Sequence, residues 1–453
     1  ACSGLSVKAA KEEWKQLGLG KKNLTIALDW MHKEFSDAPV LGSLINPTKS
    51  NAANIVSWHE LSTTLNAALD QESVIAQDGE ASLQSLEATV VAQGMAKAAT
   101  MLAGQYQWVV TNVPYLARGK QDDTLRNYIE KNYPAGKNDL ATAFLDRCLE
   151  FCVKGGSTSL VLPQNWLFLT SYKKFREKLL REDTWNMLAR LGSGAFDTIS
   201  GEVVKAILIT LSQGNFEAEQ QGLFSGDATD HRLRGVDVSE AKSAGAKAEQ
   251  LRDCQVKSVG QSEQMENPDY RIALEKNITG ELLENISYSY HGLTSGDMPR
   301  MKFCFWEVSD ERNIWIPFQG TVNYPQIFGG NESMLRWENG QGSILELQGA
   351  RKDGTGAWDK SGILISQMGE LPVTQYNKLA FDNNTAALIP NNENDLSAIW
   401  CFCSSPEFNL AVREVDQALK VTNATLVKVP FDLEFWQTVA NKKYPNGLPK
   451  PYT

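Results

Sequence analysis

The stretch YQWVVTNVPYLARGK, residues 106–120, contains the feature that decides the fold. An apolar run at Trp108–Val110 is typical of a short buried strand, and it is followed at once by Asn112, Pro114 and Tyr115. An amide and a proline after an apolar run indicate a turn. In an open α/β sheet, ligands bind outside the carboxyl ends of the strands. The turn therefore lies where a functional site is expected.

Helices and strands alternate in the residues that follow this turn. The patterns predict helices over DDTLRNYIEKNY, NDLATAFLDRCLEFCVKGG and SYKKFREKLLRED, and strands over STSLVLP, WNMLARLG and VVKAILITLS. The second helix has Asn138 or Asp139 as its N-cap. This alternation predicts an α/β domain with a largely parallel sheet. The last two strands lack a helix between them, which makes them candidates for an antiparallel pair at an edge.

Changes in composition divide the chain into four regions. Residues 1–104 have mostly helical patterns and are expected to pack on a core at residues 105–215. Residues 216–283 are polar and predict an extended connector with one helix. Residues 284–453 contain short apolar runs between Gly, Asn and Asp, so they predict a second, β-rich α+β domain that ends in helices.

The overall charge argues mildly against a nucleic-acid partner. The formal net charge is −10 and the isoelectric point is near 5.2, whereas nucleic-acid-binding domains are usually basic. A local basic cleft remains compatible with this charge, because binding to phosphate depends only on the charges that meet it.

The seven cysteines are scattered, and the four histidines are not close to them. Zinc sites need paired Cys or Cys/His ligands, so the sequence predicts no metal site. We expect reduced core thiols in a cytoplasmic protein. No run of about eighteen apolar residues occurs, so the sequence predicts no membrane partner.

The turn at Asn112–Tyr115 contains groups that suit a base bearing an exocyclic amine. The Asn112 side-chain oxygen accepts a hydrogen bond, and Pro114 fixes the direction of the neighbouring carbonyl at Val113. The ring of Tyr115 stacks on a planar base. Two acceptors that bind both hydrogens of an amine leave its lone pair free to act as a nucleophile. Taken alone, however, the four residues also suit a plain turn at the end of a strand.

The turn resembles the (Asn/Asp/Ser)-Pro-Pro-(Tyr/Phe) motif of amino-group DNA methyltransferases, with Val113 in place of the first proline. Further stretches resemble bacterial N6-adenine-specific methylases of the BREX and type II restriction–modification kind. In order, these are APVLGSLI, KNDLATAFLDRCLEFCVKGG, LVLPQNWLFLTSYKKFREKLL and LGSGAFDTISGEVVKAILITL. LTSGDMPRMKFCFWEV and KLAFDNNTAALIPNN resemble the target-recognition domain that follows in those proteins.

The resemblance implies a partial Rossmann-like methyltransferase sheet, followed by a β-rich target-recognition domain. The methyl donor is then S-adenosylmethionine, and the substrate is an adenine flipped out of double-stranded DNA. Asn112 and the carbonyl near Val113 take the amine hydrogens, Pro114 sets the turn, and Tyr115 stacks on the base. The implied role is site-specific methylation in host defence or restriction–modification, alongside other defence-system subunits. The alternative is a catalytically inactive or partial DNA-recognition subunit.

Four further residues are candidates for substrate binding. Arg118 and Lys120 directly follow the turn and suit contacts to phosphate. Asn165 and Trp166 end the next predicted strand, where they either line the base pocket or form a turn and its hydrophobic plug.

The cofactor-binding residues stay unassigned. The resemblance implies a Gly-rich turn upstream, but Ala1–Gly4 follows no strand and Leu17–Asn23 is more simply a helix stop. We therefore expect the chain to lack the amino-terminal half of the cofactor site, as a fragment or as one piece of a split enzyme.

Overall fold

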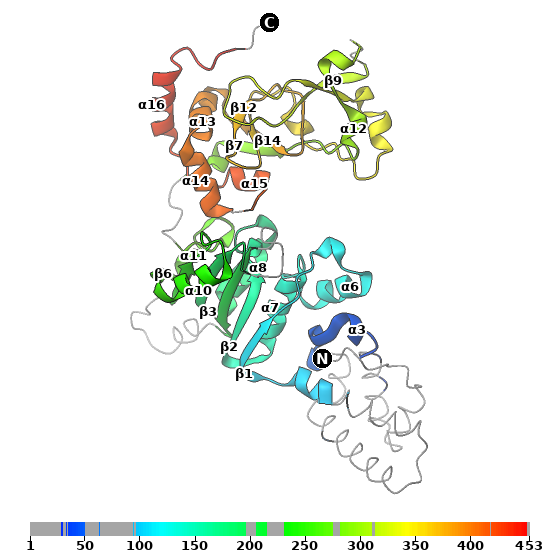
Figure 1. The fold of residues 1–453 in the computed structure, drawn as a ribbon, viewed down its shortest axis with the longest axis vertical. Helices are drawn as coiled ribbons and strands as arrows, with labels where there is room; N and C mark the ends of the chain where they lie inside the picture. The colour runs from blue at the N-terminus through cyan, green and yellow to red at the C-terminus, as the bar shows by residue number, and fades with distance from the viewer. Residues whose placement is uncertain are drawn as a thin grey trace. The chain divides into compact units, whose positions relative to one another are not determined.

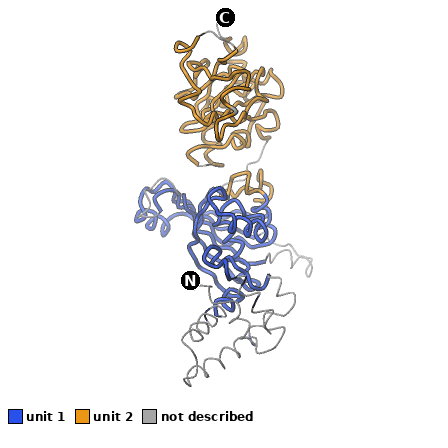
Figure 2. The backbone as a smooth tube through the Cα atoms, turned by 90° about the vertical axis from the view of Figure 1, so that its right-hand side faces the viewer, with its two compact units in different colours: residues 1–166, 174–262 blue, residues 167–173, 263–453 orange. Residues whose placement is uncertain are grey.

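The computed structural model describes residues 35–49, 97–195, 205–214, 231–274, 281–309, 313–416 and 418–450, with isolated positions at 29, 33, 63 and 94. The chain divides into two compact units (Figure 2). Unit 1 comprises residues 1–166 and 174–262, and unit 2 comprises residues 167–173 and 263–453. Most of the helical pattern predicted for residues 1–104, with the stretches at 1–4 and 17–23, lies outside the described residues.

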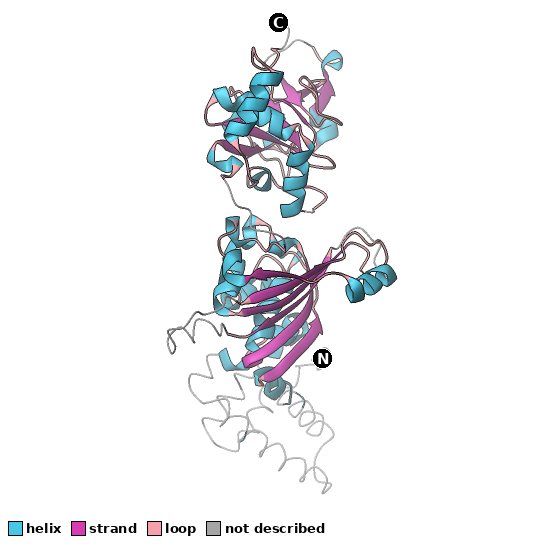
Figure 3. Cartoon of the chain, turned by 90° about the vertical axis from the view of Figure 1, so that its left-hand side faces the viewer, coloured by secondary structure: helices cyan, strands magenta, loops and turns pink. Residues whose placement is uncertain are grey.

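A six-stranded sheet in the order β1-β2-β4-β3-β5-β6 forms the centre of unit 1 (Figures 1 and 3). Its strands are β1 (Tyr106–Asn112), β2 (Cys152–Pro163), β3 (Thr184–Gly192), β4 (Ala206–Ser212), β5 (Arg232–Asp237) and β6 (Lys257–Gly260). The β1–β2 and β3–β5 pairs are parallel, and the other three are antiparallel. The α/β class is confirmed, but the prediction of a largely parallel sheet is wrong.

The central position of β4 explains this difference. The predicted antiparallel pairing of β3 with β4 is confirmed, but β4 lies between β2 and β3 and not at an edge. Its side chains Ile207, Ile209 and Leu211 are buried, and the strand carries no charge. An apolar strand of this kind is most stable with a neighbour on each side, because both rows of backbone groups are then paired.

The segment predicted as a polar connector contains two strands of the sheet. Residues 216–283 include β5, β6 and the helix α10 (Ala244–Asp253). The prediction of an extended connector is therefore wrong for this part of the segment. Arg232 and Arg234 of β5 are exposed while Leu233 and Val236 are buried, so the strand belongs to the sheet although its two arginines give it a polar composition.

Three helices accompany the first strands: α6 (Asp123–Asn132), α7 (Leu140–Glu150) and α8 (Lys173–Glu182). Asp139 caps α7 by accepting a hydrogen bond from the backbone N–H of Ala141. Helix α7 packs against β2, whose alternate residues Leu160 and Leu162 are buried. No helix among the described residues is long and apolar enough to cross a membrane.

Unit 2 contains two four-stranded sheets, in the orders β13-β9-β10-β8 and β12-β11-β14-β7. The strands are β7 (Ser287–His291), β8 (Lys302–Cys304), β9 (Trp315–Gln319), β10 (Ser333–Arg336), β11 (Ile363–Ser366), β12 (Val373–Gln375), β13 (Ala380–Phe381) and β14 (Thr385–Pro390). Helices α13 (Leu396–Cys403), α14 (Pro406–Val415) and α16 (Leu433–Lys443) follow, and α13 lies in the largest core of this unit. The β-rich α+β pattern agrees with the predicted class, and a target-recognition role remains a prediction.

The six described cysteines are free thiols. Cys148, Cys152, Cys401 and Cys403 are buried. Burial raises the pKa of Cys148 to about 12 and that of Cys152 to about 11. These groups are therefore protonated core side chains, as the sequence predicted.

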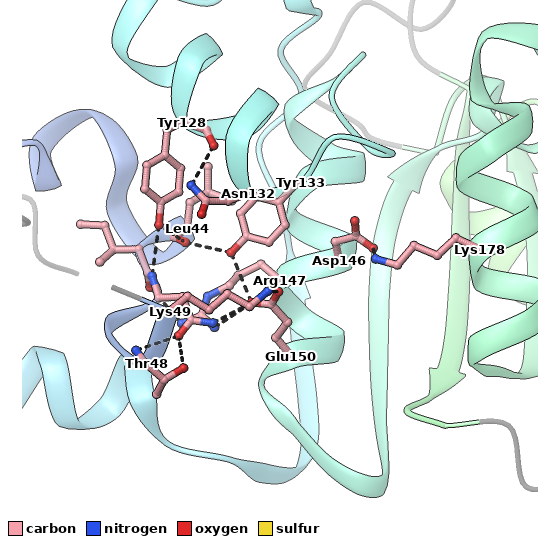
Figure 4. A network of polar contacts seen from close by, with 12 residues as sticks. Leu44, Thr48, Lys49, Tyr128, Asn132, Tyr133, Asp146, Arg147, Glu150 and Lys178 are labelled. Carbon is pink, nitrogen blue, oxygen red and sulfur yellow. Dashed lines mark hydrogen bonds and ion pairs between the residues drawn. The ribbon is translucent and has the colours of Figure 1, made fainter. Parts of the chain in front are cut away.

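The buried side chain of Arg147, on α7 beside Glu150 (Figure 4), contacts two separate backbone segments. Its guanidinium donates hydrogen bonds to the carbonyls of Ser43 at 3.2 Å, Ile45 at 2.9 Å and Leu102 at 2.5 Å. It also lies 3.4 Å from the Glu150 carboxylate. Residues 43–45, which follow the short helix α3 (Ala38–Leu41), are thereby fixed against α7.

Two tyrosine hydroxyls hold the same segment. Tyr128 and Tyr133 donate to the carbonyl of Leu44 at 3.2 Å and 3.1 Å. The Asn46 amide donates to Glu150 at 2.7 Å. Residues 43–46 are therefore positioned by polar contacts from both α6 and the end of α7.

We expect Arg147→Met to lower the free energy of unfolding by about 3–5 kcal/mol, because it leaves three buried carbonyls without their charged donor, while Glu150 keeps its ion pair with Lys49. Urea unfolding of the full chain measures this change. Arg126→Met is the matched control, since among the described residues Arg126 on α6 forms an ion pair only with the exposed Asp123. We expect this substitution to cost less than about 1 kcal/mol. Equal losses for the two variants would contradict this role of Arg147.

Candidate functional site

Asn112 lies at the carboxyl end of β1, as the sequence predicted. The parallel pairing of β1 with β2 places Asn112 opposite Val161, near the carboxyl end of both strands. The residue is exposed, and its side-chain amide forms no hydrogen bond with any described residue. An unpaired amide in this position is available to a ligand.

Strand β1 itself is not buried, and that prediction is wrong. Trp108 and Val110 are 65% and 72% exposed. β1 is an edge strand that pairs with β2 alone among the described strands, so its apolar side chains have little to pack against.

The turn after β1 is anchored by its second and fourth residues. Val113 is buried, whereas Pro114 is exposed. The hydroxyl oxygen of Tyr115 is buried and has no hydrogen-bond partner among the described residues, although the residue as a whole is partly exposed. Burial, together with the charge of Asp139, raises the pKa of Tyr115 to about 12. The hydroxyl of Tyr115 therefore points into the protein. The exposed part of the residue consists of its remaining atoms.

The residues after Tyr115 run alongside the start of α7. The backbone N–H of Leu116 donates to the Asp139 carboxylate at 3.3 Å, and the Leu116 carbonyl accepts from Leu140 N–H at 3.0 Å. Arg118 N–H donates to the Asn138 carbonyl at 3.0 Å. The pairing of β1 with β2 therefore fixes one end of the turn, and α7 fixes the other.

A cavity of about 370 Å³ opens beside the turn. It is lined by residues 38–44 together with Leu102, Pro114, Leu140 and Phe144. This volume is within the range of small-molecule sites. Sequence reasoning missed the cavity because Leu140 and Phe144 show only the apolar stripe of a helix. Nothing in the sequence indicates that residues 38–44 pack beside them.

Arg118 and Lys120 differ in their availability. Arg118 lies 2.5 Å from Glu130, which Lys137 also approaches at 3.4 Å. The hydrogen bond from Arg118 lowers the pKa of Glu130. Lys120 is exposed and forms no ion pair with any described residue. Lys120 is therefore freer than Arg118 to meet a phosphate.

Of the two roles predicted for Trp166, the structure favours the hydrophobic plug over the wall of a base pocket. The ring is fully buried and packs against Phe175 and Trp185, with centroids 5.5 Å and 5.8 Å away. It is the hydrophobic plug of the turn after β2. Asn165 remains a candidate, because its side-chain oxygen is buried and has no hydrogen-bond partner among the described residues.

Metal ligands do not gather at this site. Within the described ranges, no group of three or more His, Cys, Asp or Glu side chains is placed to hold a metal ion.

Comparison with known proteins relates the first part of the chain to a family. Residues 24–196 match the Eco57I restriction-modification methylase family. This part of the chain is therefore similar to Eco57I-type restriction-modification methylases.

The curated relatives are adenine-specific methyltransferases. The chain is 26% identical over 277 residues to PglX of Lacticaseibacillus casei (strain Zhang), a match that covers 56% of the chain and 22% of PglX. It is 33% identical over 172 residues to BrxX of Escherichia coli O9:H4 (strain HS), covering 38% of the chain and 13% of BrxX. The chain thus corresponds to less than a quarter of the length of either relative.

A solved structure is also similar. The type IIL restriction-modification enzyme MmeI in complex with DNA is 13% identical, with a TM-score of 0.46. The match covers 75% of this chain and 50% of MmeI.

We expect Tyr115→Phe to leave the free energy of unfolding unchanged or slightly higher, because the hydroxyl it removes is buried without a partner. Thermal unfolding measures the effect. The matched control is Tyr133→Phe, which removes a buried hydroxyl that donates to Leu44 and is expected to cost about 1 kcal/mol. A loss at Tyr115→Phe as large as at Tyr133→Phe would show that the Tyr115 hydroxyl has a partner in solution.

Proposed function

We propose that this chain belongs to a site-specific DNA methyltransferase that transfers a methyl group from S-adenosylmethionine to the N6 amine of an adenine flipped out of double-stranded DNA. The role is host defence or restriction–modification. The observation that carries the proposal is the turn at Asn112–Tyr115, which presents an unpaired amide and a partly exposed tyrosine at the carboxyl end of β1. The family match and the adenine-specific relatives support it.

Asn112 and the backbone after it provide the acceptors for the amine. The Asn112 side-chain oxygen takes one N6 hydrogen, and a carbonyl at Val113 takes the other. Both bonds draw the nitrogen lone pair out of conjugation with the ring and point it at the methyl carbon. S-adenosylmethionine, when bound, would supply a methyl group on a positively charged sulfur that departs as a neutral thioether. The two oxygens would hold the amine during the transfer, and because neither is basic enough to keep a proton, the methylated nitrogen would lose its extra proton to water.

Tyr115 and Val113 set the position of the base. The Tyr115 ring provides a stacking surface, which is sequence-tolerant and suits an extruded base. The family motif has a proline where this chain has Val113. Burial of the Val113 side chain anchors the turn at that position by packing. The turn geometry therefore rests on packing as well as on Pro114.

We assign the adenosyl part of the cofactor to the cavity beside Pro114. Leu102, Pro114, Leu140 and Phe144 provide apolar walls for a planar ring, and residues 38–44 line another part of the cavity. Pro114 belongs to both the turn and the cavity lining. The proposed sites for the methyl donor and for the adenine base are therefore adjacent. These residues are our candidates for cofactor binding.

DNA contacts are assigned to two places. Lys120 follows the turn and is free to bind phosphate, and the second domain, residues 284–453, is the candidate for target recognition. Other defence-system subunits are candidate partners. The free buried thiols suit the reducing cytoplasm.

One observation favours a second candidate function. Val113 replaces the first proline of the motif, which suits a catalytically inactive DNA-recognition subunit that retains the fold.

Transfer of a labelled methyl group from S-adenosylmethionine to DNA adenine tests the proposal, with the protein in its full natural length. We expect Asn112→Ala to lower the rate about 10²–10³-fold, because it removes one preorganised hydrogen-bonding group at the reacting atom. Gln107→Ala is the control, since Gln107 is an exposed residue of the same strand and its loss leaves the rate unchanged.

Two results would contradict the proposal. An unchanged rate in Asn112→Ala removes the assignment of the turn. A folded wild-type protein that binds DNA and transfers no methyl group supports the recognition subunit instead.

A further inference from the structure

We propose that Asp139 is a positioning residue of the candidate site, which fixes the residue after Tyr115 and thereby the placement of the tyrosine ring. This inference rests on the proposed function of the turn, but its structural half is measurable without any methyl transfer.

The Asp139 carboxylate joins two segments through a single oxygen. Its Oδ1 accepts a hydrogen bond from Ala141 N–H at 2.9 Å, inside the first turn of α7, and from Leu116 N–H at 3.3 Å. Asp139 is 8% exposed. One buried carboxylate oxygen therefore caps a helix and also holds the chain directly after the candidate base clamp.

Both backbone groups of Leu116 are fixed. Its N–H is held by Asp139, while its carbonyl accepts from Leu140 N–H at 3.0 Å and from the buried Gln121 amide at 3.1 Å. The preceding strand is held in register by β2, with Asn112 opposite Val161. Tyr115 is consequently the last residue of a short turn whose two ends do not move independently.

Helix capping alone does not account for the burial of Asp139. Asp122 caps α6 with a bond of similar length, from Leu125 N–H at 3.0 Å, and it is exposed. Burial raises the pKa of Asp139, although the hydrogen bonds from Ala141 and Leu116 oppose that shift. Burying a carboxylate with backbone partners alone costs stability, so this cost points to a second role beyond the cap.

The charge of Asp139 also acts on the tyrosine. It contributes to the raised pKa of Tyr115, yet no hydrogen bond joins the two side chains. Asp139 therefore acts on Tyr115 through the backbone of Leu116 and through its field, and not by direct contact with a substrate.

Two substitutions at Asp139 separate its role as the cap of α7 from its hydrogen bond to Leu116, which we call the tether. Asp139→Ser keeps a side-chain oxygen that caps its own helix, but this oxygen is one atom shorter in reach toward Leu116. Asp139→Asn keeps an acceptor at full reach. Asp122→Ser is the matched control, because it alters a cap that touches no residue of the turn.

The first measurement is amide hydrogen exchange at Leu116 in the full chain. We expect Asp139→Ser to accelerate exchange about tenfold or more, and Asp139→Asn and Asp122→Ser to leave it near the wild-type rate. Wild-type exchange at Leu116 in Asp139→Ser overturns the tether, whether or not the protein transfers methyl groups.

The second measurement is the kinetics of methyl transfer. We expect Asp139→Ser to lower kcat about 10–100-fold with an unchanged KM for DNA, since a small misplacement of a positioning group acts on the reacting geometry. Asp139→Asn restores most of kcat. Faster exchange at Leu116 with unchanged kcat would overturn the positioning role of Asp139. A wild-type protein without methyl transfer would refute the proposed function, and the exchange measurement would still show whether Asp139 holds Leu116.

Discussion

The buried guanidinium of Arg147 is the interaction on which the candidate site depends. It binds the carbonyls of Ser43, Ile45 and Leu102 and so holds two segments that precede the sheet against α7. Those segments form one wall of the cavity beside Pro114. At its amino-terminal end, the same helix holds the chain after Tyr115. Helix α7 therefore holds both the cavity wall and the chain after Tyr115. Moving either wall segment away from Arg147 would leave a buried charge without its partners, which costs free energy.

Local patterns along the sequence predicted much of the fold. The apolar stripe of α7, its cap at Asn138 or Asp139, and the strand that ends at Asn112 all follow from residues close together in the chain. The place of β4 between β2 and β3 did not follow, because strand order depends on contacts between distant segments. Strand β5 was missed since its exposed Arg232 and Arg234 gave it the composition of a linker.

The part of the site that depends on the chemistry of neighbouring side chains was predicted from the sequence. The polar turn was recognised from the acceptor, the proline and the aromatic ring that it brings together. Burial decided the rest: Trp166 became a core residue, and Arg118 became the partner of Glu130, twelve residues further along the chain. The cavity needs residues 38–44 to meet Leu102 and Phe144, and no periodicity encodes that meeting. The Asp139 bond to Leu116 spans 23 residues and is likewise invisible in the sequence.

In the proposed function, the turn at Asn112–Tyr115 presents an adenine amine for methylation. The most direct test is the chemical identity of the modified base in DNA from cells that express the full-length protein, compared with cells that lack it. We expect N6-methyladenine at one recurring sequence, present only in cells that express the protein. Methylation of cytosine, or DNA without a modification that depends on the protein, would contradict it.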